Sequence, residues 1–324
     1  MEPVRIGVIG VGAWGANHVR VLASAPEARF VGCYDRDPER ARAAAARGGG
    51  RAYDDLDDLL GEVEAATIAV PTSAHGEVAL RALARGVHVL VEKPIAPVPA
   101  EAEEMERAAR RAGRILAVGH LERFNPAVAA LLAEGCDPRF VEIHRLSPFD
   151  VRGLDVSVVL DLMIHDIDIL LRIARSPLAG LEATGVAVLS PNIDIANARL
   201  RFENGCVANL TASRISLAKT RKIRIFEENR YISLDYTEQA ATIYRRTGEL
   251  PPPDRLTPES FARLIERRAL EVEKGEPLRI EILHFLRAVR GGEARVVPAG
   301  EATEALCIGH AILEKIRKNR GTGG

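Results

Sequence analysis

The sequence has few cysteines, and their spacing excludes the usual cysteine-based sites. Its 324 residues contain four cysteines, which lie far apart and form no CxxC pair: Cys33, Cys136, Cys206 and Cys307. Zinc sites and redox motifs need closely spaced cysteines, and disulfide frameworks occur mostly in small secreted domains. Neither a metal site nor a disulfide framework is therefore expected, and the thiols should be reduced and packed.

Long hydrophobic runs and a net charge are also missing. No uninterrupted apolar run approaches the roughly 18 residues of a membrane helix, and "MEPVRIGVIG" enters a strand pattern without a signal-peptide composition. The 44 Lys and Arg residues balance 45 Asp and Glu residues, for a formal charge of -1. The N-terminus and the absence of long apolar runs predict a cytoplasmic protein, and because no global field attracts polyanions, nucleic-acid and membrane partners are not expected.

Lysine is scarce, since only six of the 44 basic residues are lysines. Arginine stays charged and bonds as a rigid fork, whereas lysine is a compact cation whose pKa moves on burial. A lysine that this composition retains is a candidate for chemistry. Lys93 is one of the six.

The first 118 residues alternate short β-branched runs with helical stretches rich in Ala, Arg and Glu. The runs are "VRIGVIG", "ARFVGCYD", "ATIAV", "HVLVE" and "RILAVG". Helices are expected near 16–24, 38–47, 73–85 and 99–113. This alternation predicts an α/β fold with a doubly wound parallel sheet of the Rossmann type over residues 1–120.

The pattern changes near residue 120 and predicts a second, α+β domain over 121–324 with a largely antiparallel open sheet. Asn204-Gly205 between alternating runs predicts a two-residue hairpin turn, in which both residues need positive φ. The exposed link "LPPPDRLTP" follows. The other expected elements are a helix near 125–134, a strand in "RFVEIHRL", a helix over 157–174, strands from about 181 to 246, and helices near 257–274, 279–290 and 300–318.

The motif "GVGAWG" at residues 10–15 follows the first strand and opens a helix. In a dinucleotide-binding turn, Gly10 makes the tight turn and Gly12 lets the backbone approach a pyrophosphate. Gly15 then allows the helix and the strand to pack closely. Glycines of an ordinary strand-to-helix turn are the alternative, but an acidic residue at the end of the second strand favours the dinucleotide interpretation.

That acidic residue is Asp35, twenty residues beyond Gly15. A carboxylate there accepts hydrogen bonds from ribose hydroxyls and repels a 2′-phosphate, so NAD is expected as the cofactor. Arg36 and Arg40 keep NADP as the minority alternative.

Two further strand ends should meet the same crevice. "VPTSAH" at residues 70–75 places Pro71 and Thr72 there, although Thr72 or Ser73 could instead cap the next helix. "HVLVEKPIAP" places Glu92 and Lys93 at another strand end, where the following proline keeps Lys93 extended.

The apolar stretch "VLDLMIHDIDIL" at 159–170 carries a polar stripe, because Asp161, His165 and Asp168 share one helix face. A core histidine satisfied by a neighbouring aspartate is one interpretation. A metal site that includes Asp166 is disfavoured, since Asp166 and Asp168 point to different faces.

Together these motifs, with "EKPIA" and "VGHLERFNPA", resemble the glucose-fructose oxidoreductase / inositol dehydrogenase / MocA family of NAD(P)-dependent enzymes, from residue 4 to the last helix. The resemblance implies that Lys93, Asp161 and His165 surround the reacting carbinol, and that the peptide bond between Lys93 and Pro94 is cis. His165 has the pKa range to accept the hydroxyl proton, and Asp161 could orient it. Lys93 would stabilise the developing alkoxide.

His120, with the residues after it, makes the sequence more similar to family members that oxidise UDP-N-acetylated sugars. A secondary hydroxyl of a sugar nucleotide, first of all the 3-hydroxyl of UDP-N-acetylglucosamine, is therefore the expected substrate. A free-sugar or inositol dehydrogenase is the alternative, and a regulatory protein that senses NAD without turnover is another. The expected substrate-binding residues are His120, Arg123, Asn125 and Arg214.

The basic segment around Arg214 could also be a solvated or subunit-facing strand, because strand alternation sends its cations to both faces. A sheet with helices on one face predicts a homodimer or homotetramer through the open face. The C-terminal helix is a candidate to pack back on the first domain.

The expected cofactor-binding residues are Gly10, Gly12, Ala13, Trp14, Gly15, Asp35, Arg36, Pro71, Thr72, His75, Glu92 and Lys93.

Overall fold

The structure is a computed structural model that describes residues 2–149, 156–249, 252 and 257–321. The chain forms two compact units, Met1–Phe124 with Glu276–Cys307 and Asn125–Gly275 with Ile308–Gly324. Residues 121–324 were predicted to form the second domain, with the C-terminal helix as a candidate to pack back on the first. Helix α9 (Pro277–Val289) belongs instead to the first unit, because its apolar face is buried in that unit's core.

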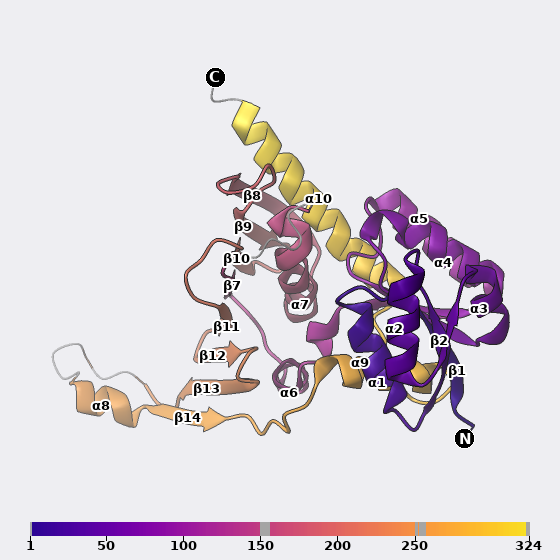
Figure 1. Cartoon of the computed structure of the whole chain (residues 1–324). Helices are drawn as coiled ribbons and strands as arrows, with labels where there is room; N and C mark the ends of the chain where they lie inside the picture. Colours follow the sequence, from indigo (N-terminus) through magenta and orange to yellow (C-terminus); the bar gives the residue numbers. More distant parts are fainter. Residues whose placement is uncertain (1, 150–155, 250–251, 253–256, 322–324) are drawn as a thin grey trace. The chain divides into compact units, whose positions relative to one another are not determined.

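The first unit contains a six-stranded sheet with the order β3-β2-β1-β4-β5-β6 (Figure 1). Every pair of neighbouring strands is parallel. The strands are β1 (Val4–Ile9), β2 (Ala28–Tyr34), β3 (Arg51–Tyr53), β4 (Ala65–Ile68), β5 (His88–Glu92) and β6 (Leu116–Gly119). This confirms the predicted doubly wound sheet, whose order reverses between β1 and β4, where such sheets bind dinucleotides.

Helices connect these strands close to the expected positions. They are α1 (Gly15–Ala23), α2 (Pro38–Gly48), α3 (Leu56–Glu62), the 3₁₀ turn η1 (Thr72–Ala74), α4 (His75–Ala84), α5 (Pro99–Ala112) and the 3₁₀ turn η2 (Leu121–Phe124). Strand β3 and helix α3 were not predicted. With three and seven residues, they are too short to display a hydrophobic period.

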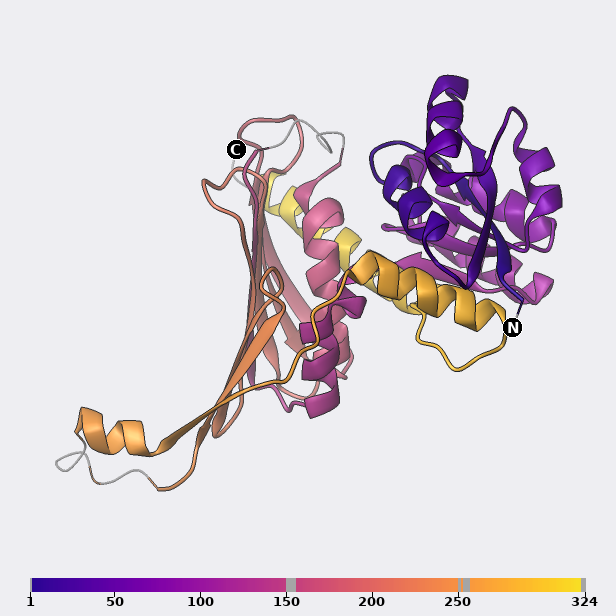
Figure 2. The same cartoon turned by 60° about the horizontal axis from the view of Figure 1, so that its bottom comes forward.

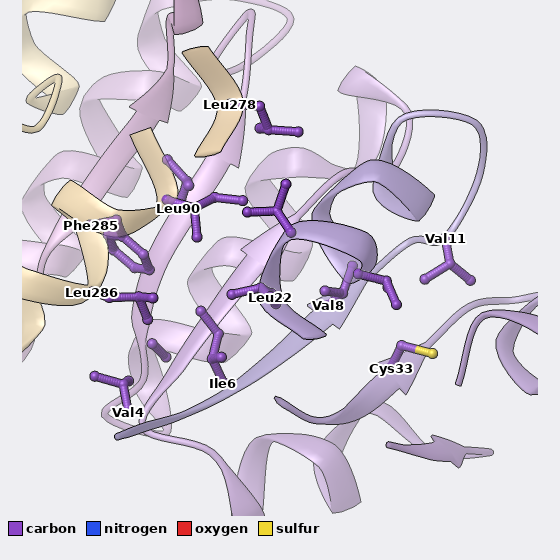
Figure 3. Packing of buried hydrophobic residues seen from close by; sticks show 14 of the residues in the cluster. Val4, Ile6, Val8, Val11, Leu22, Cys33, Leu90, Leu278, Phe285 and Leu286 are labelled. Atoms are coloured by element: carbon purple, nitrogen blue, oxygen red, sulfur yellow. The ribbon is translucent and has the colours of Figure 1, made fainter. Parts of the chain in front are cut away.

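The core of the first unit lies between the sheet and α1 and α9. Figure 3 shows Leu278, Phe285 and Leu286 of α9 beside side chains of β1 and α1. Strand β1 is buried at five of its six residues, as expected for a central strand covered on both faces. The sheet ends that carry the candidate site are therefore held by a well-packed scaffold.

The second unit contains an eight-stranded sheet with the order β14-β13-β12-β11-β7-β10-β9-β8. Its pairs are antiparallel except β7 with β10, which confirms the predicted largely antiparallel sheet. The strands are β7 (Phe140–Leu146), β8 (Leu178–Val186), β9 (Ile195–Phe202), β10 (Val207–Ser213), β11 (Thr220–Phe226), β12 (Arg230–Asp235), β13 (Ala240–Arg246) and β14 (Ile265–Ala269).

Apart from α8 (Pro258–Arg263), the helices of the second unit lie on one side of this sheet, which Figure 2 shows nearly edge-on. They are α6 (Pro126–Glu134), the π-helical turn η3 (Val159–Met163), α7 (Ile164–Ala174) and the later part of α10 (Ala299–Gly321). Strand β7 alternates accordingly, with Val141, Ile143 and Arg145 buried and the residues between them half-buried. Among the described helices, none combines the length and the apolar character needed to cross a membrane.

The turn between β9 and β10 corrects a prediction. The hairpin is present, but its loop is longer than two residues, and Gly205 adopts a positive φ of 87° while Asn204 does not. The Gly205 amide donates to the Phe202 carbonyl. Asn204 is held by its side chain instead, which accepts from the Cys206 amide and donates to the Ala174 carbonyl.

The predicted helix over 257–274 is wrong for most of its length. Helix α8 spans only Pro258–Arg263, and β14 then pairs antiparallel with β13. The residues of β14 are good helix formers, but the edge of β13 offers unpaired backbone groups that a strand can satisfy. The preceding link "LPPPDRLTP" lies largely outside the described residues.

Candidate functional site

A cavity of about 470 Å³ lies in the first unit, where β1, β2 and β4 end. This is the point at which the strand order reverses. The residues that line it come from the ends of β1 and β2, from the segments that follow the three strands, and from α2 and α4: Ile9, Gly10, Gly12, Ala13, Trp14, Tyr34, Asp35, Arg36, Arg40, Ala69, Val70, Pro71, Ser73, Ala74 and Val78. Most of the residues expected to bind the cofactor are thus brought to one cavity.

The three glycines after β1 differ in what a side chain at each position would meet. Gly10 has a φ of 83°, which favours glycine. A Cβ on Gly15 would lie 1.9 Å from the Gly10 carbonyl oxygen, so only glycine allows this close packing of α1. A Cβ on Gly12 would meet no atom within 4 Å. The open side of Gly12 leaves its backbone accessible to a phosphate group, as the motif requires.

Asp35 closes the cavity at the end of β2. Its carboxylate accepts from the Val11 amide at 2.7 Å and from the Asp37 amide at 2.9 Å, so it also fixes the glycine-rich turn. Of the two nearby cations, Arg40 forms an ion pair with Asp37 at 3.2 Å. The negative charge of Asp35 therefore faces the cavity with one of its neighbouring cations already engaged.

The loop after β4 contributes Pro71 and Ser73 to the cavity wall, but neither Thr72 nor His75. Thr72 begins the 3₁₀ turn η1, and the N-caps of η1 and α4 are Pro71 and Ala74. Neither end has a side-chain cap, so capping by Thr72 or Ser73 is wrong. His75 is 1% exposed, and its two ring nitrogens contact backbone carbonyls behind the cavity wall.

Lys93 is half-buried and directly follows β5, and its peptide bond to Pro94 is cis, as the resemblance implied. The preceding Glu92 is buried, and its carboxylate contacts the His18 ring at 2.9 Å. Burial raises the pKa of Glu92, but hydrogen bonds from His18 and Trp14 and the charges of His18 and Lys93 hold it below its ordinary value. Glu92 is thus a buried anion that adjoins Lys93.

His18 was missed in the sequence. It lies on α1, three residues after the glycine motif, and is fully buried. A histidine on the inward face of this helix was the only available signal, and such a residue is more often a satisfied core histidine than a functional one. Its partner is 74 positions away, which the sequence pattern does not show.

Three of the residues expected to bind substrate lie near residue 120, where one is buried, one forms an ion pair and one forms hydrogen bonds within the protein. His120 is fully buried after β6. Arg123 forms an ion pair with Glu301. Asn125, at the start of the second unit, caps α6 by accepting from the Ala127 amide and also donates to the Tyr236 carbonyl.

The polar stripe of the second unit begins in a π-helical turn. Asp161 is half-buried in η3, and His165 and Asp168 on α7 are 8% and 1% exposed. Single π-helical turns are rare and often lie at functional sites. Asp166, on another face, forms a two-pronged ion pair with the buried Arg145 at 2.8 and 2.9 Å, so its carboxylate is committed to holding α7 against β7.

Arg214 is 4% exposed, and its guanidinium donates to the Val156 carbonyl and lies 3.9 Å from the carboxylate of Asp194. Burial raises the pKa of Asp194, but hydrogen bonds from Ser190 and from three backbone amides lower it to about 2. Arg214 therefore lies beside a stable anion that organises the loop between β8 and β9.

Comparison with known proteins adds to this geometry. Residues 4–120 match the family model "Oxidoreductase family, NAD-binding Rossmann fold", and residues 138–233 match "GFO/IDH/MocA C-terminal domain". The chain is 38% identical over 291 residues to UDP-N-acetylglucosamine 3-dehydrogenase of Acidithiobacillus ferrooxidans, and the aligned region covers 89% of this chain and 90% of that protein. A solved structure of UDP-N-acetylglucosamine 3-dehydrogenase from this organism superposes with a TM-score of 0.90 at 35% identity, over 98% of both chains. Inositol 2-dehydrogenase of Leifsonia xyli is 34% identical over 194 residues, 55% of this chain and 56% of that protein.

Proposed function

Because the chain belongs to the Gfo/Idh/MocA family of NAD-binding oxidoreductases, we propose that it oxidises the 3-hydroxyl of UDP-N-acetylglucosamine and reduces NAD. The observation that carries the substrate is the similarity to UDP-N-acetylglucosamine 3-dehydrogenase, which extends over 89% of the chain. The inositol dehydrogenase of Leifsonia xyli is similar over only 55% of the chain, and scyllo-inositol 2-dehydrogenase of Bacillus subtilis, which is similar over 97%, is only 25% identical. The observation that supports the cofactor is the cavity lined by Gly10, Gly12 and Asp35.

NAD, held at the cavity lined by Gly10, Gly12 and Asp35, would supply the hydride acceptor for the carbinol carbon. His165 accepts the hydroxyl proton, because an imidazole titrates in the range that general bases need. Asp161 orients this imidazole, and Lys93 stabilises the negative charge that develops on the oxygen. A sensor without turnover would need the nucleotide-binding residues alone, so the retention of a lysine at the strand end and a histidine on the polar stripe favours an enzyme.

The test is formation of NADH on addition of a panel of sugar nucleotides, free sugars and inositols, followed at the absorbance of NADH. UDP-N-acetylglucosamine should give the fastest turnover. His165→Ala should lower turnover by roughly 100-fold or more and leave NADH affinity unchanged, because a general base acts on the proton and not on the nucleotide. The matched control is His144→Ala, on the β7 face opposite α7. Equal losses in both variants, or turnover with inositol alone, would refute the proposal.

We also propose that the protein forms a homodimer or a homotetramer through the open face of the second sheet. Four stacked aromatic rings on neighbouring strands cross this face, with centroid distances of 5.0 to 5.7 Å: Phe140, Phe226, Tyr231 and Tyr244. Half-buried aromatic residues of this kind are enriched in protein interfaces. Light scattering of the wild type and of Tyr231→Glu tests this, since a charge among the rings should lower the molar mass.

A further inference from the structure

Lys93 lies between two neighbours that each contact a buried histidine. Glu92 precedes it and lies 2.9 Å from the His18 ring, and Pro94 follows it and places its carbonyl oxygen 2.9 Å from Nδ1 of His75. Both histidines are at most 1% exposed. The backbone that carries the ammonium group is therefore held on both sides.

His75 and Glu92 each also connect to one wall of the nucleotide cavity. Nε2 of His75 lies 3.0 Å from the carbonyl oxygen of Val70, which lines the cavity in the loop after β4. On the other side, the indole of Trp14, which lines the cavity in the loop after β1, helps to lower the pKa of the Glu92 carboxyl. One contact chain therefore runs from Val70 to Pro94, and the other runs from Trp14 to Glu92.

The carboxylate of Glu92 has little freedom to move. Glu92 as a residue is only 7% exposed, and it is the register partner of Gly119 where β5 pairs with β6. A Cβ on Gly119 would lie 3.0 Å from both of its oxygens, so glycine is what leaves room for the carboxylate. A buried anion is costly unless several groups bond it, and His18 and Trp14 supply those bonds. This makes Glu92 a firm anchor for the residue that follows it.

The chemistry of His75 distinguishes its two contacts. Both partners are carbonyl oxygens, which only accept hydrogen bonds, whereas a neutral imidazole has a single N–H to donate. The two contacts can therefore be separated by substitution. The amide nitrogen of asparagine occupies the place of Nδ1, and that of glutamine occupies the place of Nε2.

We propose that His18 and His75 are positioning residues that hold Lys93 between the two loops of the nucleotide cavity. His75 acts through the carbonyl of Pro94, and His18 acts through the carboxylate of Glu92. This rests on the proposed function, in which Lys93 stabilises the developing alkoxide. It adds that the lysine is placed by the loops that bind the nucleotide.

The experiment compares His75→Asn, which keeps a donor toward Pro94, with His75→Gln, which keeps a donor toward Val70. The first readout is the rate at which an amine-reactive acylating reagent labels Lys93 in the enzyme without nucleotide, followed by mass spectrometry. The other five lysines of the chain serve as internal controls. Labelling of Lys93 should rise at least threefold in His75→Gln and stay near the wild-type rate in His75→Asn.

The second readout is kinetic. His75→Gln should lower kcat at least tenfold with little change in NADH affinity, whereas His75→Asn should weaken NADH binding and retain kcat within about threefold. NADH affinity is read from quenching of Trp14, the only tryptophan of the chain, by energy transfer to the nicotinamide. His18→Phe should raise Lys93 labelling and shift the Trp14 emission, and His18→Gln, which keeps a donor toward Glu92, should restore both.

Unchanged labelling of Lys93 in His75→Gln and in His18→Phe overturns the inference. The inference is also overturned if both His75 variants lose kcat and NADH affinity only in proportion to the drop in their melting temperature. That outcome would indicate a role of His75 in folding alone. Labelling requires no sugar, so a wrong substrate leaves this readout intact. Failure of the wild type to bind NADH would refute the proposed function instead.

Discussion

Substituting two glycines of the same motif should separate nucleotide binding from folding. Gly12→Ala adds a methyl group that meets no atom within 4 Å, whereas Gly15→Ala adds one at 1.9 Å from the Gly10 carbonyl oxygen. Each variant differs from the wild type by one added methyl group, and the two positions are three residues apart. We expect the first to lose NADH affinity at wild-type stability, and the second to lose stability.

The magnitudes follow from these distances. Overpacking costs about 1–3 kcal/mol, and we expect the upper end or more at Gly15, because a backbone oxygen shifts less readily than a side chain. For a domain of this size 1 kcal/mol lowers the Tm by about 2–4 °C, so Gly15→Ala should lose about 6–12 °C. At Gly12, loss of a hydrogen bond to a charged phosphate costs about 1.5–3 kcal/mol, which is roughly 10- to 150-fold in NADH affinity.

Thermal melts without nucleotide measure the first quantity, and quenching of Trp14 by NADH measures the second. The Tm of Gly12→Ala should stay within about 2 °C of the wild type, or rise slightly, because alanine restricts the unfolded chain. Wild-type NADH affinity in Gly12→Ala would refute the reasoning, since the nucleotide would then not approach the backbone at this residue. A wild-type Tm in Gly15→Ala would show that α1 can move away from Gly10.

Three further outcomes follow from the described contacts. NADH should bind at least about tenfold more tightly than NADPH when each nucleotide is titrated into the protein. Asp35→Asn keeps an acceptor for the Val11 amide but removes the repulsion of a 2′-phosphate, so it should reduce this ratio of affinities. Arg145→Met should cost about 3–5 kcal/mol in urea unfolding, because it removes both ion-pair contacts of the buried Asp166 with Arg145, and adding Asp166→Leu should recover most of the loss; an additive double variant would contradict this. Because the pKa of Asp194 is lowered to about 2, its stabilising contribution should be present above about pH 4 and be lost as the pH falls toward 2. Asp194→Asn should therefore lower the free energy of unfolding by roughly 2–3 kcal/mol at neutral pH but by almost nothing near pH 2.

Several features of the fold followed from local sequence, because the physical cause acts within one turn or one strand. Gly10 adopts a positive φ in the turn itself, and Gly15 packs against the Gly10 carbonyl oxygen five positions earlier, so the spacing of the motif suffices to predict both roles. The alternation of apolar residues predicted the first sheet, and the side chain of Asp35 lies next to the turn that the motif predicts. The same reasoning brought Lys93 forward, since a strand end and a scarce residue type are both visible in the sequence.

The rest was decided by partners far away in the chain. Residues 265–269 form good helical sequence, yet the open edge of β13 makes them a strand, because unpaired backbone groups of a sheet edge outweigh a propensity of a few tenths of a kcal/mol per residue. Helix α9 joins the first unit because its apolar face fits there. His18 and His75 contact the neighbours of Lys93 across 74 and 19 positions. Those contacts exist because the sheet places the ends of β1, β4 and β5 together, and strand order is a property of the folded chain rather than of any local pattern.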